Sequence, residues 1–123
     1  VNLSANVLSN QGDGGGDDEI SFTVNVLGGG NNLAFGDVTP GVLKSQTITI
    51  ENEGSGSIYI ESAVSGDEVF RNYINLDGLS WRNFSLNLNG NTSDDTQVNL
   101  QVPSSYSNPG SKSGKLIFWA TAN

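Results

Sequence analysis

The sequence is poor in the side chains that carry out covalent and acid–base chemistry. Its 123 residues include no His and no Cys, which excludes a zinc site of the usual ligand types, a Cys nucleophile and a Ser-His-Asp triad. Two adjacent carboxylate pairs, Asp67-Glu68 and Asp94-Asp95, lie in turn-like segments, where such charges mostly serve solvation. Because a glycosidase needs two carboxylates across a cleft, we predict no catalytic residue and no enzymatic activity.

The acidic charge balance argues against one class of partner, nucleic acid. Thirteen acidic residues against five basic ones give a formal charge of −8, which argues against binding to nucleic acid, since phosphates require a basic face. The sequence has no run of 18 apolar residues, so we expect no membrane-spanning helix. Without Cys, no disulfide can staple the fold, which must rest on packing alone.

An acidic glycine-rich stretch covers residues 12–19. It resembles one turn of a calcium-binding Gly/Asp repeat, but such sites need stacked copies to supply enough oxygen ligands. We therefore predict neither a metal nor a cofactor, and we interpret the stretch as a solvated, flexible hinge built on Gly12, Gly14, Gly15 and Gly16.

Aromatic residues offer one candidate binding surface. A sugar-stacking platform could be formed by five of them, namely Trp81, Trp119, Tyr59, Tyr73 and Tyr106. This makes a secreted carbohydrate-binding or adhesion module, monomeric and self-complemented, the main alternative function. Aromatic side chains in a sandwich belong more often to the core or to a subunit interface.

Three Asn-x-Ser/Thr sequons are candidate N-glycosylation sites. They begin at Asn2, Asn83 and Asn91. Asn91 follows an Asn-Gly turn and is the best candidate, whereas Asn83 adjoins an alternating strand. A glycan on Asn2 requires the polar face of the first strand to stay wet.

Apolar and polar residues alternate with a period of two along most of the chain, which is typical of half-buried strands. The clearest runs cover residues 20–26, 84–88 and 98–102, with shorter ones at 48–50 and 58–60. Residues 116–120 are apolar on both faces, which predicts a central strand. Residues 67–79 fit either a short helical turn or an irregular strand.

Turn signals rich in Gly, Asn and Pro separate these runs at intervals near ten residues. The pattern predicts an all-β fold: a single antiparallel β-sandwich, jelly-roll or Ig-like, of about seven or eight strands over residues 19–123. An N-terminal extension strand over residues 1–8 precedes it.

The extension strand places Val1, Leu3, Ala5 and Val7 on one face. Residues 9–18, which contain no apolar side chain, follow as a linker that reaches on the order of 33 Å when extended. This connection is longer than a hairpin requires. Either the strand completes its own sandwich, or it leaves its domain and completes the sheet of a neighbour by β-strand addition.

Side-chain burial alone does not hold this strand. Burying three aliphatic side chains and one Ala contributes roughly 5–9 kcal/mol, whereas ordering eight backbone residues costs roughly 8–16 kcal/mol. A ladder of main-chain hydrogen bonds must supply the rest, which requires a real gap in the recipient sheet. Head-to-tail donation then generates an open filament when the rotation between subunits does not close.

Two passages of the domain carry a family resemblance. Residues 36–41 (Gly-Asp-Val-Thr-Pro-Gly) lead into the Thr-rich strand and Asn-Glu-Gly turn of residues 46–56, and Tyr59 and Ile60 open the next strand. The closing passage contains Asn108-Pro109-Gly110, Gly114 and the apolar run 116–120. Over residues 33–123 the chain thus resembles the TasA/camelysin-type secreted β-sandwich subunits and their archaeal relatives, the bundling-pilus and thread-filament proteins.

The resemblance implies a structural subunit that polymerises outside the cell by donor-strand complementation. Val1, Leu3, Ala5 and Val7 would be the inserted knobs of a head-to-tail homopolymer in a pilus, thread or biofilm-matrix fibre. The protein would be secreted with its leader peptide removed and located at the cell surface. In a secreted archaeal or eukaryotic protein, the three sequons could carry glycans. Its expected partners are other copies of itself, with surface glycans or neighbouring filaments as further candidates.

Overall fold

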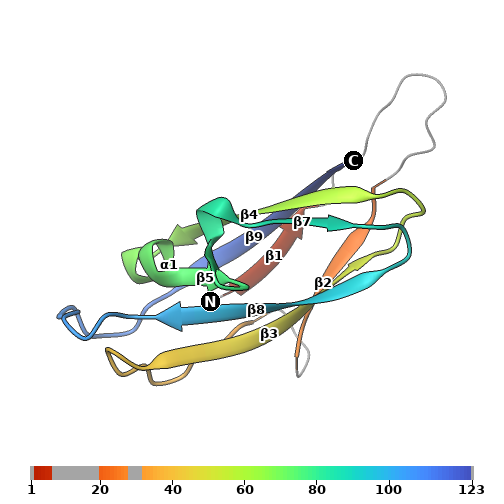
Figure 1. Ribbon diagram of the computed structural model, residues 1–123. Coiled ribbons are helices and arrows are strands. Elements are labelled where there is room, and N and C mark those ends of the chain that lie inside the picture. Colours follow the sequence, from red (N-terminus) through yellow and green to blue (C-terminus); the bar gives the residue numbers. More distant parts are fainter. Residues whose placement is uncertain (1, 7–19, 28–31, 123) are drawn as a thin grey trace.

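The computed structural model describes residues 2–6, 20–27 and 32–122, and its elements are drawn in Figure 1. The fold is all-β, as the alternation predicts, with one short α-helix and one 3-10 helix. The elements in chain order are β1 (Asn2–Asn6), β2 (Phe22–Val26), β3 (Leu43–Asn52), β4 (Ile58–Gly66), α1 (Glu68–Tyr73), β5 (Ile74–Leu76), β6 (Leu79–Ser80), η1 (Trp81–Asn83), β7 (Ser85–Leu88), β8 (Ser93–Gln101) and β9 (Gly114–Ala122).

The strands form two sheets that share one hydrophobic core. The first has the order β1-β9-β4-β7, and the second has the order β2-β3-β8-β5-β6. Every pairing is antiparallel except that of β1 with β9, which is parallel. The long strands of the two sheets lie over each other in Figure 1, an arrangement that fits a sandwich.

Alternation along the strands fills the core from both sides. Ile60 and Phe118 of the first sheet and Ile48 and Val98 of the second are completely buried. Phe118 also meets Phe84 edge to face, with ring centroids 6.2 Å apart. The predicted central strand at residues 116–120 is confirmed, because β9 lies between β1 and β4.

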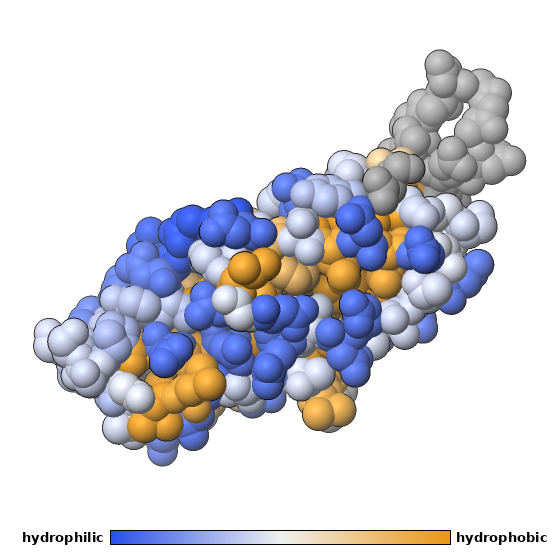
Figure 2. Space-filling model, viewed as in Figure 1, coloured by the Kyte–Doolittle hydropathy of each residue, from blue (hydrophilic) through white to orange (hydrophobic). Residues whose placement is uncertain are grey.

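The outer face of the second sheet is polar and held together by side-chain hydrogen bonds. Ser45 donates to Asn99 and Thr49 donates to Asp95, both at 2.7 Å across the β3–β8 pair. Figure 2 shows hydrophilic side chains over most of the visible face, with separate apolar areas between them. The outward positions of the first sheet are less polar and include the half-buried Tyr59, Ile117 and Trp119.

The segment that the sequence leaves open between helix and strand contains both. Residues 68–73 form α1, whose Val69 and Phe70 are buried, and the chain then extends as β5. A tight turn at Asp77 and Gly78, with φ of 51° and 84°, folds β6 back on β5. Asp-Gly with two positive φ angles is typical of a type I′ hairpin, and this hairpin raises the strand count to nine among the described residues.

Asn52 ties two neighbouring turns together. Its side chain is 1% exposed, and its Nδ2 donates to the carbonyls of Gly56 at 2.8 Å and of Leu88 and Asn89 at 3.1 Å. Its Oδ1 accepts from the backbone N–H of Gly54 at 3.0 Å. The amide therefore joins the β3–β4 turn to the end of β7 and the turn after it.

Thr96 carries the one buried side-chain polar atom without a hydrogen-bond partner among the described residues. The residue is fully buried in the core, beside Ile48 in the β3–β8 register. A buried hydroxyl without a partner costs free energy that an isosteric methyl group does not. We therefore expect Thr96→Val to raise the free energy of unfolding by about 1 kcal/mol.

Urea-induced unfolding measures this change directly. Thr121→Val on the exposed part of β9 is the matched control, because it makes the same chemical change outside the core. A Thr96→Val protein no more stable than the control would show that the hydroxyl is satisfied in solution.

Among the described residues, no helix is both long enough and apolar enough to cross a membrane.

Candidate functional site

The candidate site is the edge of β9 that β1 covers. The two strands run side by side in Figure 1, and β1 pairs with residues 115–119 of β9. The register sets Leu3 beside Leu116 and Ala5 beside Phe118. On its other edge, β9 pairs with β4 along its whole length, from Gly114 to Ala122.

This edge needs a partner strand for two reasons. Without β1, the N–H and C=O groups along this side of β9 would be left unpaired, and an unpaired strand edge is a template for another chain. The strand is also apolar: Leu116, Phe118 and Ala120 are at most 1% exposed. The site, called here the β9 slot, is thus an edge position beside an apolar strand, filled here by residues from the other end of the sequence.

Of the four predicted donor-strand residues, two lie in the described part of β1 and two lie outside the described residues. Leu3 and Ala5 occupy the register positions beside the inward-facing residues of β9. Val1 and Val7 lie outside the described residues, as do the predicted hinge glycines Gly12, Gly14, Gly15 and Gly16. The linker prediction for residues 9–18 falls in the same undescribed part.

Two of the three sequons have exposed asparagines. Asn83 ends η1, and Asn91 lies in the β7–β8 turn with a positive φ of 58°. The backbone N–H of Asn91 donates to the carbonyl of Gly54 at 2.9 Å, which fixes the turn and leaves the side chain exposed. Asn2 is the first residue of β1. N-glycosylation at these positions stays a prediction.

The five aromatic residues of the sugar-platform hypothesis do not form one surface. Tyr73 and Tyr106 meet edge to face at 6.1 Å, near α1. Trp81 donates from its ring N–H to the Arg71 carbonyl at 2.8 Å, and its face is covered by the Arg82 guanidinium at 4.3 Å. Tyr59 and Trp119 lie on the outward positions of the β4–β9 pair. The platform is thus divided among three places.

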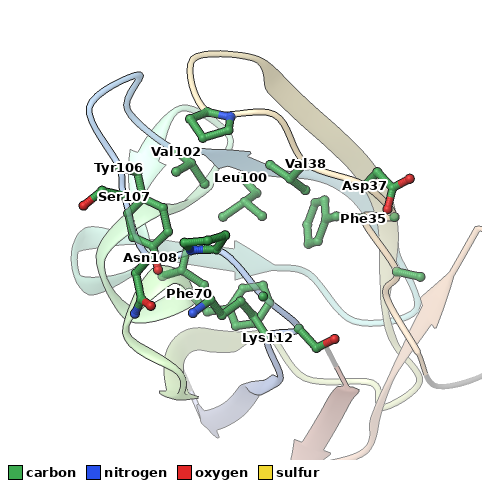
Figure 3. A pocket seen from close by; sticks show the side chains of 17 residues that line it. Phe35, Asp37, Val38, Phe70, Leu100, Val102, Tyr106, Ser107, Asn108 and Lys112 are labelled. Atoms are coloured by element: carbon green, nitrogen blue, oxygen red, sulfur yellow. The ribbon is translucent and has the colours of Figure 1, made fainter.

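A pocket at the α1 end of the molecule has no counterpart in the sequence predictions. It has a volume of about 940 Å³ and lies between residues 34–40, residues 106–112 and α1. Figure 3 shows Phe35, Leu100 and Val102 in its wall. Only the connecting loops bring these residues together, so strand periodicity gives no signal for the pocket.

Tyr106 lines this pocket and is held in its neutral form. Its hydroxyl donates to Oε1 of Glu68 at 2.6 Å. This bond to a carboxylate, assisted by desolvation, raises the pKa of Tyr106 to about 12. The Lys112 ammonium lies 5.9 Å from the ring centroid. A neutral tyrosine over an apolar floor suits packing or docking and supplies no nucleophile.

Among the described residues, no group of three or more metal-ligating side chains is placed to hold a metal ion. Comparison of the chain with protein-family models and with curated proteins gives no match, so the proposal below rests on the residues and their geometry.

Proposed function

We propose that this protein is a structural subunit of an extracellular filament, in which β1 of one copy occupies the β9 slot of the next. The observation that carries the proposal is the parallel β1–β9 pair at the edge of the first sheet. The covering strand comes from the opposite end of the sequence, pairs with no other strand, and is joined to the domain only through residues 7–19.

The strand order supports this proposal. In a constant-type immunoglobulin sandwich, strands A, B, E and D form one sheet and C, F and G form the other. Here β2, β3, β8 and β5 follow the order of A, B, E and D, and β4 and β9 follow that of C and F. Strand β1 then occupies the edge position that corresponds to G, although it is parallel to its neighbour. Strands β6 and β7 have no counterpart in this comparison.

Exchange of β1 between copies preserves its contacts, because the same residues fill the same slot. The competition between the two arrangements is therefore decided by concentration. Covalent linkage to its own domain gives β1 a high effective concentration, which for short flexible linkers in general is in the millimolar range. Dilute protein is then expected to remain self-complemented, and growth requires either concentrated subunits or additional contacts between them.

The composition fits an extracellular location. With no Cys and no Met, the chain offers no sulfur to oxidants, and with no His its charge is insensitive to pH near neutrality. A secreted homopolymer subunit needs none of these side chains for chemistry.

Electron microscopy of the concentrated full-length protein tests the proposal. We expect unbranched filaments of uniform width. A preparation that stays monomeric and dispersed at millimolar concentration would contradict it.

A further inference from the structure

The basic residues are gathered toward one end of the molecule. The α1 end is defined here by α1, the start of β3, the loop before β9 and the start of β9; Gly66 pairs with Gly114 there. Four of the five basic residues of the chain lie at this end: Lys44, Arg71, Lys112 and Lys115. Arg82, on η1, lies between the two ends, because the carbonyl of its neighbour Trp81 binds mid-strand Ser62.

The opposite end is acidic. The turn end is defined here by residues 51–57 and 89–95, the two turns that Asn52 joins. It carries Glu51, Glu53, Asp94 and Asp95, and all four are exposed. The turn end therefore has four negative charges and no positive one. The α1 end carries four positive charges and three carboxylates, a net charge of +1. The carboxylates are Asp37, Asp67 and Glu68.

These charges are not paired with one another within the described part of the molecule. In the described part of the chain, no Lys or Arg side chain forms an ion pair with a carboxylate. Arg71 instead donates to the Gly66 carbonyl, and Arg82 and Lys112 lie over aromatic rings. The two ends thus present complementary and unpaired charge.

We propose that the acidic turn end of one copy docks on the basic α1 end of the next. The proposal rests on the filament function above and names its subunit interface. Electrostatic complementarity of this kind raises association rates and selects orientation more than it adds affinity. It supplies the additional contact that strand exchange requires in order to compete with self-complementation.

Chain connectivity favours the same polarity independently. In the slot, β1 starts at the α1 end beside Lys115. Asn6 lies beside Trp119, which is five residues or about 16 Å along β9 from Gly114 at 3.3 Å per residue. The donor's chain resumes at its own turn end, where the Ser21 carbonyl accepts from Glu53. If that turn end abuts the acceptor's α1 end, the tether between residues 6 and 20 spans roughly 16 Å plus any sideways offset.

The reverse polarity leaves the tether much less slack. If the donor's α1 end met the acceptor's turn end, the path from Asn6 to residue 20 would run along the rest of one subunit and the whole of the next. For strands of nine residues, this is three steps from Trp119 to Ala122 and eight steps along the next subunit, roughly 36 Å before the loops are added. Fourteen Cα–Cα steps reach only about 46–50 Å when fully extended.

Two charge-reversal proteins test the docking. The turn-end variant is Glu51→Lys with Glu53→Lys and Asp94→Lys, and the α1-end variant is Lys44→Glu with Lys112→Glu, none of which lies in the β9 slot. Filament growth is followed by light scattering and electron microscopy at low salt. Each variant alone is expected to grow at least about tenfold more slowly than the natural protein, since like charges then meet at every interface.

A one-to-one mixture of the two variants should restore growth to within about threefold, because each reversed end meets an oppositely charged partner in an alternating polymer. Glu61→Lys, between the ends on β4, is the control for a charge change elsewhere and is expected to grow normally. Undiminished growth of either variant alone, or no recovery in the mixture, would overturn the docking.

This outcome is separable from that of the filament function. Versions of both variants lacking residues 1–8 should still bind a synthetic peptide of residues 1–10, because the β9 slot is unchanged. Normal peptide binding with charge-independent growth would refute the docking and leave strand exchange intact. Filament growth by chains that lack residues 1–8 would refute strand exchange itself.

Discussion

Removal of residues 1–8 is expected to abolish filament growth and to leave a soluble, less stable monomer. The truncation exposes the edge of β9 over residues 115–119, where β1 pairs in the intact chain. Each main-chain hydrogen bond lost from this ladder costs about 0.5–1.5 kcal/mol net, and the buried Leu116 and Phe118 lose their neighbouring strand. Electron microscopy and urea unfolding measure the two effects.

Adding the missing strand back as a peptide distinguishes two effects of β1. One is the stability gained when the slot is filled, and the other is the linkage of one subunit to the next. A synthetic peptide of residues 1–10 should stabilise the truncated protein without restoring filaments, since it fills the slot but links no subunits. The same peptide with Leu3→Asp and Ala5→Asp is the control, because it sets carboxylates in register with the apolar Leu116 and Phe118 of β9. Filaments from the truncated protein alone would contradict strand exchange.

The second large effect is expected at Asn52. Replacement by Ala removes four hydrogen bonds at a side chain that is 1% exposed. It also leaves the carbonyl of the buried Leu88 without this donor, whereas the Asn89 carbonyl still accepts from Thr92 Oγ1. A buried group left unsatisfied costs about 1–3 kcal/mol. We expect Asn52→Ala to lower the free energy of unfolding by about 3–5 kcal/mol.

Thermal and urea unfolding of the monomer measure this loss. Asn99→Ala is the matched control: it removes one hydrogen bond with Ser45 on the wet face of the second sheet and should cost less than about 1 kcal/mol. Equal losses at the two positions would show that the two turns hold together without the Asn52 amide.

The sequence predicts the strands and their buried faces, but it predicts only part of the hydrogen bonding at Asn52. The alternation of Phe22, Val26, Ile48 and Ile50 with polar residues predicts strands and their buried faces, because a half-buried strand repeats every two residues. The Asn-Glu-Gly turn at Asn52 is likewise visible in the sequence. Three of its bonds are not, since they join residues that are 36 and 37 positions apart or depend on the fold of the turn.

The sequence likewise predicts only part of the candidate site. The pattern of residues 1–8 predicts a separate strand with one apolar face. Its partner, its parallel direction and its register depend on a pairing across more than 110 residues, which no local pattern encodes. The charge separation is equally non-local: Lys44 and Lys115 are brought to one end by the strand order alone.

The most direct measurement is a disulfide cross-link between β1 of one copy and β9 of another. The chain has no Cys, so any disulfide that forms must join two introduced cysteines. Ser4 and Ile117 are register partners. Neighbouring strands lie about 4.8 Å apart, within the Cα–Cα range of a disulfide. Proteins of different tagged size, one with Ser4→Cys and one with Ile117→Cys, are mixed, assembled and oxidised.

Strand exchange predicts a covalent dimer that contains one chain of each kind, formed in filaments and absent from dilute monomer. A mixture of Ser4→Cys with Asn99→Cys, whose second position lies in the other sheet, should give no such dimer. If filaments form and the mixed dimer does not appear, while a single chain carrying both Ser4→Cys and Ile117→Cys closes its own disulfide, β1 stays within its own subunit and strand exchange is contradicted.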